Sequence, residues 1–300
     1  MKVFIAFCMM LWCGTAIAST IVVEDRRGAQ TFDRTPERIV VLDWALAQQV
    51  LDLGIVPVAA PEIGLYRDWV EEPAMPDGVV DIGRRDAPNL ELLSTLNPDV
   101  IVASDLSEAD VARLEQIAPT LVFAAFDGDH DNVAMARRIY LTLARLFDRD
   151  AFAQAQLDKM ETEIDRLSLD LRQARYGEIA DVAIIRMNDL STVWIYGENS
   201  FAEAALHRLG LRNALPQSAN RWGVVQRPLE SLAEVGSGAV LAIRPHMRGT
   251  QVFETVMWRF MPFVQKQRFA EVPPVWSYGG ILALGRHARA IHAGLTSLAP

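Results

Sequence analysis

Aromatic side chains gather in polar, glycine- and proline-rich segments of this chain. Trp69 and Trp222 stand beside charged or amide residues, and Trp276 and Tyr278 lie in segment 273–279. Core aromatic residues usually come from apolar periodic segments, so these positions predict loops and strand ends. Half-exposed rings on rigid loops form the wall of a binding site. Each ring alone could equally be a core residue, but the four together favour a ligand.

Arg84 and Arg85 follow a strand-like run at 79–82 and the turn residue Gly83. In an open parallel sheet, side chains at the carboxyl ends of strands face the crevice where ligands bind. A guanidinium there suits an oxygen-rich or anionic guest, because it donates paired hydrogen bonds and stays charged. The alternative for each residue is a solvated surface arginine.

The common catalytic motifs are absent from the sequence. It contains no phosphate-binding glycine loop, no dinucleotide-binding glycine pattern, no nucleophile elbow and no His-Glu-x-x-His. His287 and His292 are five residues apart and do not share a helix face, which favours ordinary surface or packing roles. The acidic segment 127–131 lacks the spacing of a calcium loop and is interpreted as solvated. We therefore expect no catalytic residues, no metal site and no cofactor.

Strand-like and helix-like segments alternate from Arg38 onward, which is typical of βαβ units. A strand at 39–42, a helix at 44–53 and a strand at 55–59 predict a parallel pair. The first lobe is assigned to 38–148. Its further elements are strands at 79–82, 100–103 and 121–123 and helices at 90–96 and 109–117.

A second lobe, assigned to 177–300, repeats the alternation. Its predicted elements are strands at 182–187, 192–196 and 239–243, a helix at 201–209 and a terminal helix from about 280 to 295. Between the lobes, Met160, Ile164, Leu167 and Leu171 recur at helical spacing. At 1.5 Å per residue, a helix over 150–174 spans roughly 37 Å. The fold class is therefore α/β, with two lobes of mainly parallel sheets joined by one linking helix, 149–176.

A weak internal repeat supports two similar lobes facing each other across a ligand cleft. Residues 88–93 followed by 99–103 resemble 228–232 followed by 239–243. Each half would place one short helix before one strand, as expected for a cleft between related lobes.

The chain starts like an exported precursor. Lys2 is followed by an apolar run to Trp12 and by small residues at Ala16 and Ala18. This pattern predicts a signal peptide, residues 1–18, cleaved after Ala18. The apolar centre is about half of the roughly 20 residues that span a bilayer, so a permanent anchor is disfavoured. Residues 19–37 then lead into the first lobe.

Both cysteines, Cys8 and Cys13, fall within this leader, so the mature chain is expected to have no disulfide and no thiolate site. The bulky Trp12 before Cys13 disfavours lipid attachment. Cleavage removes only Lys2 among charged residues and changes the formal charge from −9 to −10. An acidic surface repels phosphates, so nucleic acid is not expected as a partner.

The chain resembles the periplasmic ferric hydroxamate siderophore-binding proteins, members of the helix-linked class III solute-binding proteins of ABC importers. The similarity spans roughly residues 38–285. Seven motifs carry it: RIVVLDW at 38–44, LGIVP at 53–57, YRDWV at 66–70, DIGRRDAPNLELL at 81–93, YGENS at 196–200, MPFV at 261–264 and VPPVWSYG at 272–279.

The resemblance implies a shallow aromatic cleft that binds an intact iron complex, with the iron held only by its siderophore. It assigns the arginine that meets the iron-chelating oxygens to Arg85. A family tyrosine that partners this arginine aligns near Ser107, so that contact is lost or replaced here. The implied wall residues are Trp69, Trp222, Trp276 and Tyr278.

The resemblance also implies docking onto an inner-membrane permease, whose ATPase partner hydrolyses ATP. Glu91 and Glu230 occupy matching places in the internal repeat and are assigned this role, with Glu108 as a substitute on the first lobe. Carboxylates at helix starts often act only as capping groups, which is the alternative. We expect a monomer located in the periplasm.

Three other functions stay open. The same fold could carry a carboxylate siderophore, haem or cobalamin, although the aromatic segments offer no axial histidine or cysteine for haem. A periplasmic hydrolase would need a nucleophile and base that the sequence does not show. A metal-ion chaperone would need a cluster of histidines and carboxylates.

Overall fold

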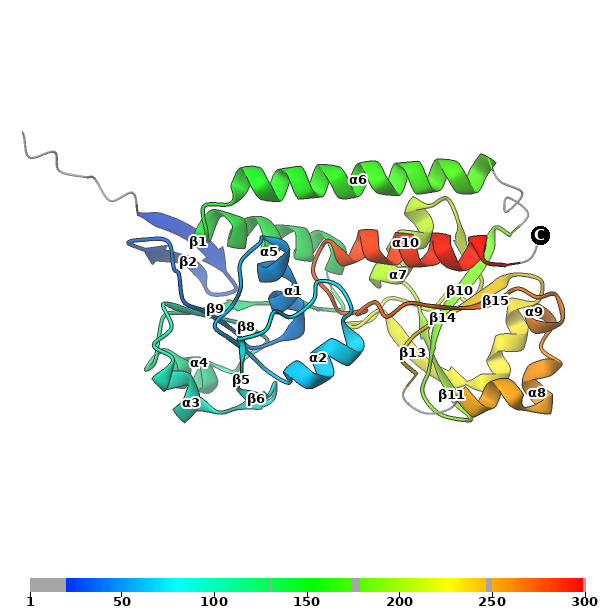
Figure 1. Cartoon of the computed structure of the whole chain (residues 1–300), viewed down its shortest axis with the longest axis horizontal. Coiled ribbons are helices and arrows are strands. Elements are labelled where there is room, and N and C mark those ends of the chain that lie inside the picture. Colours follow the sequence, from blue (N-terminus) through cyan, green and yellow to red (C-terminus); the bar gives the residue numbers. More distant parts are fainter. Residues whose placement is uncertain (1–19, 130, 174–178, 247–249, 299–300) are drawn as a thin grey trace, which may run out of the picture.

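The computed structural model describes residues 20–129, 131–173, 179–246 and 250–298. The predicted leader, residues 1–18, lies outside the described residues, as do His130 and the predicted end of the linking helix at 174–176. Two α/β lobes lie side by side, and one long helix, α6 (Asp150–Gln173), runs along both (Figure 1). The predicted fold class is confirmed.

The sheet of the first lobe is parallel throughout and has the strand order β5-β4-β3-β8-β9. Its central strands are buried on both faces, which is typical of parallel sheets covered by helices. The strands are β3 (Ile39–Val41), β4 (Ala59–Ala60), β5 (Val80–Asp81), β8 (Val100–Ser104) and β9 (Thr120–Phe123); a two-stranded hairpin adds β6 (Gly83–Arg84) and β7 (Ala87–Pro88). The helices are α1 (Trp44–Asp52), α2 (Ile63–Trp69), α3 (Leu90–Thr95) and α4 (Glu108–Leu114).

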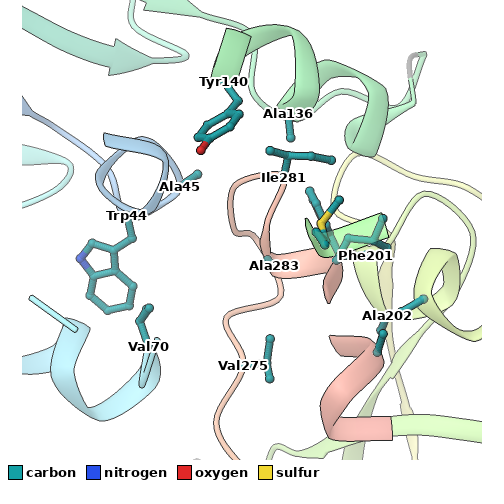
Figure 2. Packing of buried hydrophobic residues seen from close by; sticks show 14 of the residues in the cluster. Trp44, Ala45, Val70, Ala136, Tyr140, Phe201, Ala202, Val275, Ile281 and Ala283 are labelled. Atoms are coloured by element: carbon teal, nitrogen blue, oxygen red, sulfur yellow. The ribbon is translucent and has the colours of Figure 1, made fainter. Parts of the chain in front are cut away.

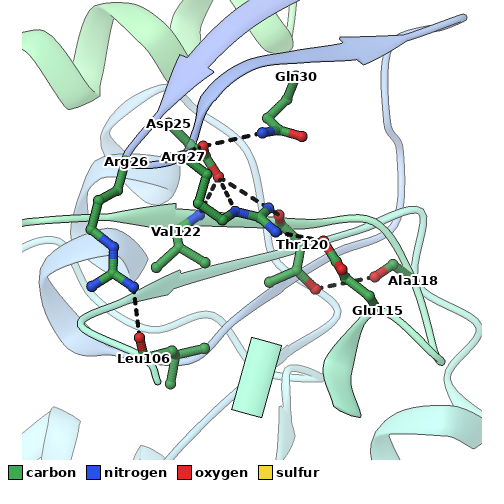
Figure 3. Close-up of polar contacts among 9 residues, drawn as sticks. All are labelled: Asp25, Arg26, Arg27, Gln30, Leu106, Glu115, Ala118, Thr120 and Val122. Atoms are coloured by element: carbon green, nitrogen blue, oxygen red, sulfur yellow. Dashed lines mark hydrogen bonds and ion pairs between the residues drawn. The ribbon is translucent and has the colours of Figure 1, made fainter. Parts of the chain in front are cut away.

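The lead-in segment forms an antiparallel hairpin, β1 (Ile21–Asp25) and β2 (Gly28–Phe32), that is tied to the first lobe. Figure 3 shows the turn of this hairpin beside β9. The Asp25 carboxylate accepts a hydrogen bond from the Val122 amide at 3.0 Å, and Arg27 pairs with Glu115 at 2.7 Å. These contacts make the hairpin part of the lobe.

The second sheet is mixed. Its order is β13-β11-β10-β14-β15, with β12 also on β10; β10 pairs in parallel with β12 and β14 but antiparallel with β11. The strands are β10 (Asp181–Met187), β11 (Thr192–Tyr196), β12 (Arg212–Asn213), β13 (Val224–Pro228), β14 (Ala239–Ile243) and β15 (Phe269–Val272). The helical segments are α7 (Phe201–Arg208), η2 (Leu229–Val235), η3 (Thr250–Glu254), α8 (Val256–Arg259), α9 (Pro262–Gln265) and α10 (Ala283–Thr296).

A layer of helices crosses from one lobe to the other. α6 lies above α5 (Asn132–Leu146) on the first lobe and above α10 on the second (Figure 1). Glu161 of α6 joins both sides, because it pairs with Arg137 of α5 at 2.6 Å and with Arg208 of α7 at 2.5 Å. The predicted apolar stripe of α6 is buried, as expected for a packed face.

One hydrophobic core runs through both lobes. Trp44 and Val70 of the first lobe face Val275 and Ile281, and Phe201 of α7 continues the cluster into the second lobe (Figure 2). Separate clusters cover the outer face of each sheet. Because closely packed cores resist sliding, this continuous interior restricts how far the lobes can move apart.

Two predicted elements differ from the structure. The predicted strand at 55–59 is reduced to β4 because Pro57 lacks a backbone N–H and cannot donate to a neighbouring strand. Trp69, predicted in a loop, ends α2. Among the described residues, no helix is long and apolar enough to cross a membrane.

Candidate functional site

A cavity of about 350 Å³ opens between the lobes at the carboxyl ends of β3 and β8. Carboxyl ends of parallel strands are where open α/β sheets bind ligands. Both lobes contribute to its wall, and five of the ten lining residues are aromatic. They are Asp43, Trp44, Ala45, Arg85, Ser104, Asp105, Phe126, Trp222, Trp276 and Tyr278.

The start of α1 forms one corner of the cavity. Asp43 caps the helix, because its Oδ1 accepts a hydrogen bond from the Leu46 amide at 2.9 Å. Its Oδ2 atom is buried and forms no hydrogen bond of good geometry among the described residues. Burial raises the pKa of Asp43, and the nearby charge of Asp105 raises it further. The Ser104 side chain lies near the carboxyl group and partly offsets the rise in its pKa. The indole of Trp44 is fixed by a hydrogen bond from Nε1 to the Pro61 carbonyl at 3.0 Å.

Arg85 lies on the tryptophan wall. Its guanidinium carbon is 3.9 Å from the ring centroid of Trp44 and 5.8 Å from that of Trp276. Arg85 Nε donates to Glu62 Oε2 at 2.5 Å, and the two Nη atoms donate no hydrogen bond to a described residue. Cation–π stacking and this ion pair hold the fork in place. Its side chain is 38% exposed, so the free nitrogens are available to a ligand.

Trp276 of the second lobe packs between two tryptophans of the first. Its ring centroid is 4.9 Å from Trp44 and 6.0 Å from Trp69, edge-on in both cases. The loop that carries it fits closely over α1, because a Cβ on Gly280 would lie 2.3 Å from Gln49 Cγ. This contact places the aromatic wall at the joint between the lobes.

A second aromatic group closes the opposite side of the cavity. Phe126, Trp222 and Tyr278 lie within 5.9 Å of one another, centroid to centroid. Trp222 is 43% exposed, so its ring is available to a guest. Gly223 behind it has a positive φ of 63°, and a Cβ there would lie 2.4 Å from the Ser200 amide nitrogen. Only glycine suits this position.

Polar contacts between the lobes fix the Trp222 loop. The Asn132 side chain donates to the carbonyls of Asn199 and Arg221, both at 3.0 Å. The Arg221 guanidinium pairs with Asp105 of the first lobe at 2.8 Å. This ion pair lies at the edge of the cavity, since Asp105 is one of its lining residues.

The structure brings four of the six predicted ligand-binding residues to the cavity: Arg85, Trp222, Trp276 and Tyr278. Trp69 is not a lining residue; it packs behind Trp276, with the buried Arg186 guanidinium 4.8 Å from its ring. Ser107 also lies off the cavity wall. It caps α4, and its hydroxyl donates to Asp110 Oδ2 at 2.6 Å.

Sequence reasoning missed Trp44, Phe126, Asp43 and Asp105 as lining residues. A usable signal existed for two of them, because Asp43 and Asp105 lie within two residues of the carboxyl ends of β3 and β8. Phe126 has no comparable signal, since only the packing of two lobes brings it beside Trp222.

The predicted docking carboxylates lie apart from the cavity. Glu91 is in the first turn of α3 and Glu230 in the first turn of η2, one on each lobe. Both residues are exposed, as is Glu108 in the first turn of α4.

The arrangement suits binding more than catalysis. The cavity combines flat aromatic surfaces, one guanidinium with free donors and two carboxyl groups. Within the described part of the chain, no group of three or more His, Cys, Asp or Glu residues is placed to hold a metal ion. An oxygen-rich guest with an apolar outer surface fits this lining.

Comparison with known proteins gives consistent results. A family model described as periplasmic binding protein matches residues 39–275. The chain is 32% identical over 280 residues to the iron(3+)-hydroxamate-binding protein FhuD of Escherichia coli K12, covering 92% of this chain and 93% of that protein. It is 24% identical over 278 residues to the Fe(3+) dicitrate-binding periplasmic protein FecB of the same organism, covering 89% and 88%.

A solved structure gives a close spatial match. The siderophore-binding protein FhuD from Vibrio cholerae, bound to Fe³⁺–Desferal, superimposes with a TM-score of 0.85 at 41% sequence identity. The match covers 88% of this chain and 99% of the other.

Proposed function

The chain belongs to the family of periplasmic binding proteins, and from this premise we propose that it binds a ferric siderophore of the hydroxamate type and delivers it to an ABC importer. It acts as a carrier and not as an enzyme. Iron enters the cleft only as the intact chelate, which is the cargo.

The cavity between the lobes carries this proposal. A ferric hydroxamate presents chelating oxygens on one side and alkyl carbons on the other. The free Nη donors of Arg85 suit the oxygens, and the rings of Trp44, Trp222 and Tyr278 suit the carbons. The similarity to an iron(3+)-hydroxamate-binding protein and to a siderophore-binding protein with Fe³⁺–Desferal bound supports the same chemistry.

A titration tests the proposal. The protein without residues 1–18 is titrated with ferric trihydroxamates, ferric citrate and haem while its tryptophan fluorescence is recorded. Ferric hydroxamates are expected to quench the fluorescence of the cavity tryptophans and to bind at least tenfold more tightly than the other two. Tighter binding of ferric citrate would favour the carboxylate-siderophore alternative and contradict the proposal.

Export and docking complete the proposed function. The leader directs the chain to the periplasm with cleavage after Ala18, and the carrier works as a monomer. Glu91 and Glu230 dock onto basic residues of the permease, one from each lobe, and the permease's ATPase drives uptake. Charge pairs of this kind increase association rates and fix orientation.

Docking is tested by combining Glu91→Ala with Glu230→Ala. The double variant should keep its siderophore affinity but lose binding to the purified permease in nanodiscs. Glu254→Ala, an exposed carboxylate of η3, is the control. Unchanged permease binding by the double variant would remove both residues from the docking surface.

A further inference from the structure

One ion pair joins the two lobes at the edge of the cavity between them. Arg221 Nη2 of the second lobe lies 2.8 Å from Asp105 Oδ2 of the first lobe, and Asp105 lines the cavity. Among the described residues, no other lining residue of this cavity forms an ion pair with the opposite lobe. We call Asp105 and Arg221 the rim pair.

The rim pair lies on the solvent side of the cavity. The side chains of Arg221 and Asp105 are 47% and 30% exposed. The Arg221 guanidinium also lies over the exposed ring of Trp222, with its carbon 4.7 Å from the ring centroid. One guanidinium therefore extends from the aromatic wall of the second lobe to a carboxylate of the first.

The backbone that carries Arg221 and Trp222 is fixed. The Asn132 side chain donates to the Arg221 carbonyl at 3.0 Å, and the Trp222 amide donates to Asn220 Oδ1 at 2.9 Å. Gly223 packs so closely against the start of α7 that no Cβ would fit there. The loop cannot swing away as a unit, so its side chains are the parts that can move.

The lobes themselves are held together on the side of α6. Arg286 of α10 pairs with Asp52 at the end of α1, and both side chains are more than nine-tenths buried. Breaking a buried pair leaves an uncompensated charge in the interior, which is costly. A half-exposed pair opens at little cost, because water solvates both partners. The rim pair is therefore easier to open than the joint between the lobes.

We propose that the rim pair is a side-chain gate, which opens to let the ferric chelate pass and closes again over it. This inference rests on the proposed function and adds how access to its cavity is controlled. When Arg221 turns into solvent, it leaves Asp105 and uncovers the face of Trp222, while the lobes keep their positions. Exposed side chains change rotamer much faster than a ligand binds. The open fraction therefore limits entry and exit alike, and a gate that is closed in both the free and the loaded protein leaves the affinity nearly unchanged.

Stopped-flow tryptophan fluorescence measures entry and exit with the N-acetylated Fe³⁺–Desferal complex. This chelate is uncharged, so a change in the charge of the protein does not alter its diffusion to the cavity. Asp105→Asn and Arg221→Gln should each raise the association and dissociation rate constants about fivefold, the scale of opening a half-exposed ion pair with its cation–π contact. The Kd should stay within about twofold. Asparagine tolerates the left-handed conformation of residue 105, whose φ is 52°.

Two controls show that the two residues act as one gate. The double variant should be no faster than either single variant, because each substitution alone already opens the pair. Arg227→Gln removes an arginine that pairs with Glu234 of the same lobe at 2.8 Å, and it should leave both rate constants unchanged.

The unmodified protein provides a test without substitution. Raising sodium chloride from about 0.05 M to about 0.5 M screens the rim pair. Both rate constants for the uncharged chelate should rise about twofold or more in the unmodified protein and stay constant in Arg221→Gln.

The outcomes separate the gate from the carrier function. Unchanged rate constants in the two single variants, or an equal response to salt with and without Arg221, would overturn the gate alone. A rise in the dissociation rate constant without a rise in association would show that the pair holds the chelate in place, and would also overturn it. Failure of the unmodified protein to bind the chelate would overturn the proposed function itself.

Discussion

Arg84 and Arg85 are adjacent in the sequence and chemically identical, but their side chains lie in different surroundings. Arg84 is paired with Asp86 at 2.6 Å and is largely exposed, whereas Arg85 stacks on Trp44 and keeps two free nitrogens at the cavity. The turn of the β6–β7 hairpin points them in different directions. Residue type and spacing identify the pair without distinguishing its members, and only the family resemblance selected Arg85 from the sequence.

Arg85→Ala should weaken ferric hydroxamate binding by about tenfold or more, because a charged hydrogen bond to the chelate is lost. Fluorescence titration measures the change. Arg84→Ala is the matched control and should bind normally. Equal effects of the two substitutions would show that only the charge of the hairpin matters, and no effect of either would remove Arg85 from the site.

His287 gives a pH dependence of stability. Burial, together with the charges of Arg186 and Arg286, lowers the pKa of His287 to about 3. The unfolded chain therefore binds a proton below about pH 6.5 while the folded chain does not, so stability falls as pH decreases from about 6.5 towards 3. At neutral pH the imidazole is uncharged, so His287 does not lower the free energy of unfolding there.

His287→Leu should remove this acid sensitivity. Between about pH 7 and pH 5, the wild-type free energy of unfolding should fall by about 2 kcal/mol more than that of the variant. Urea unfolding at both pH values measures the difference. Parallel losses in the two proteins would mean that His287 is protonated in the folded state.

At the scale of elements, α6 stabilises both lobes at once. Its buried stripe includes Leu157 and Ile164, while Leu169 on the same helix is 54% exposed. Periodic spacing predicted this helix and its buried face, because a long amphipathic pattern determines both. The strands predicted at 55–59 and 79–82 are only two residues long in the structure, as β4 and β5, and the hairpin β6–β7 was not predicted. Two-residue strands carry no periodicity and depend on their neighbours.

Leu157→Ala should lower the free energy of unfolding by about 2–5 kcal/mol, because it leaves a cavity in a fully buried contact. Leu169→Ala, the matched control on the exposed face, should change it by less than about 0.5 kcal/mol. Both values come from urea denaturation. Similar losses for the two variants would contradict the assignment of the buried face.

For the whole molecule, the continuous core limits how far the two lobes can move when a ligand binds in the cleft. Trp276 is inserted between Trp44 and Trp69, and the helical layer spans both lobes. We therefore expect backbone movements of about 1 Å or less on binding, as in other preorganised sites. The two-lobed architecture followed from alternating segments, but the shared core did not, because no sequence pattern indicates which lobe a buried residue contacts.

The most direct test of the carrier function is a crystal structure of the protein, without residues 1–18, in complex with Fe³⁺–Desferal. The chelate should lie in the cavity between the lobes, with its hydroxamate oxygens within hydrogen-bond distance of the Arg85 Nη atoms and its carbons against Trp222 and Tyr278. An iron complex bound elsewhere on the protein, or a cavity left without chelate at saturating concentration, would contradict the proposed function.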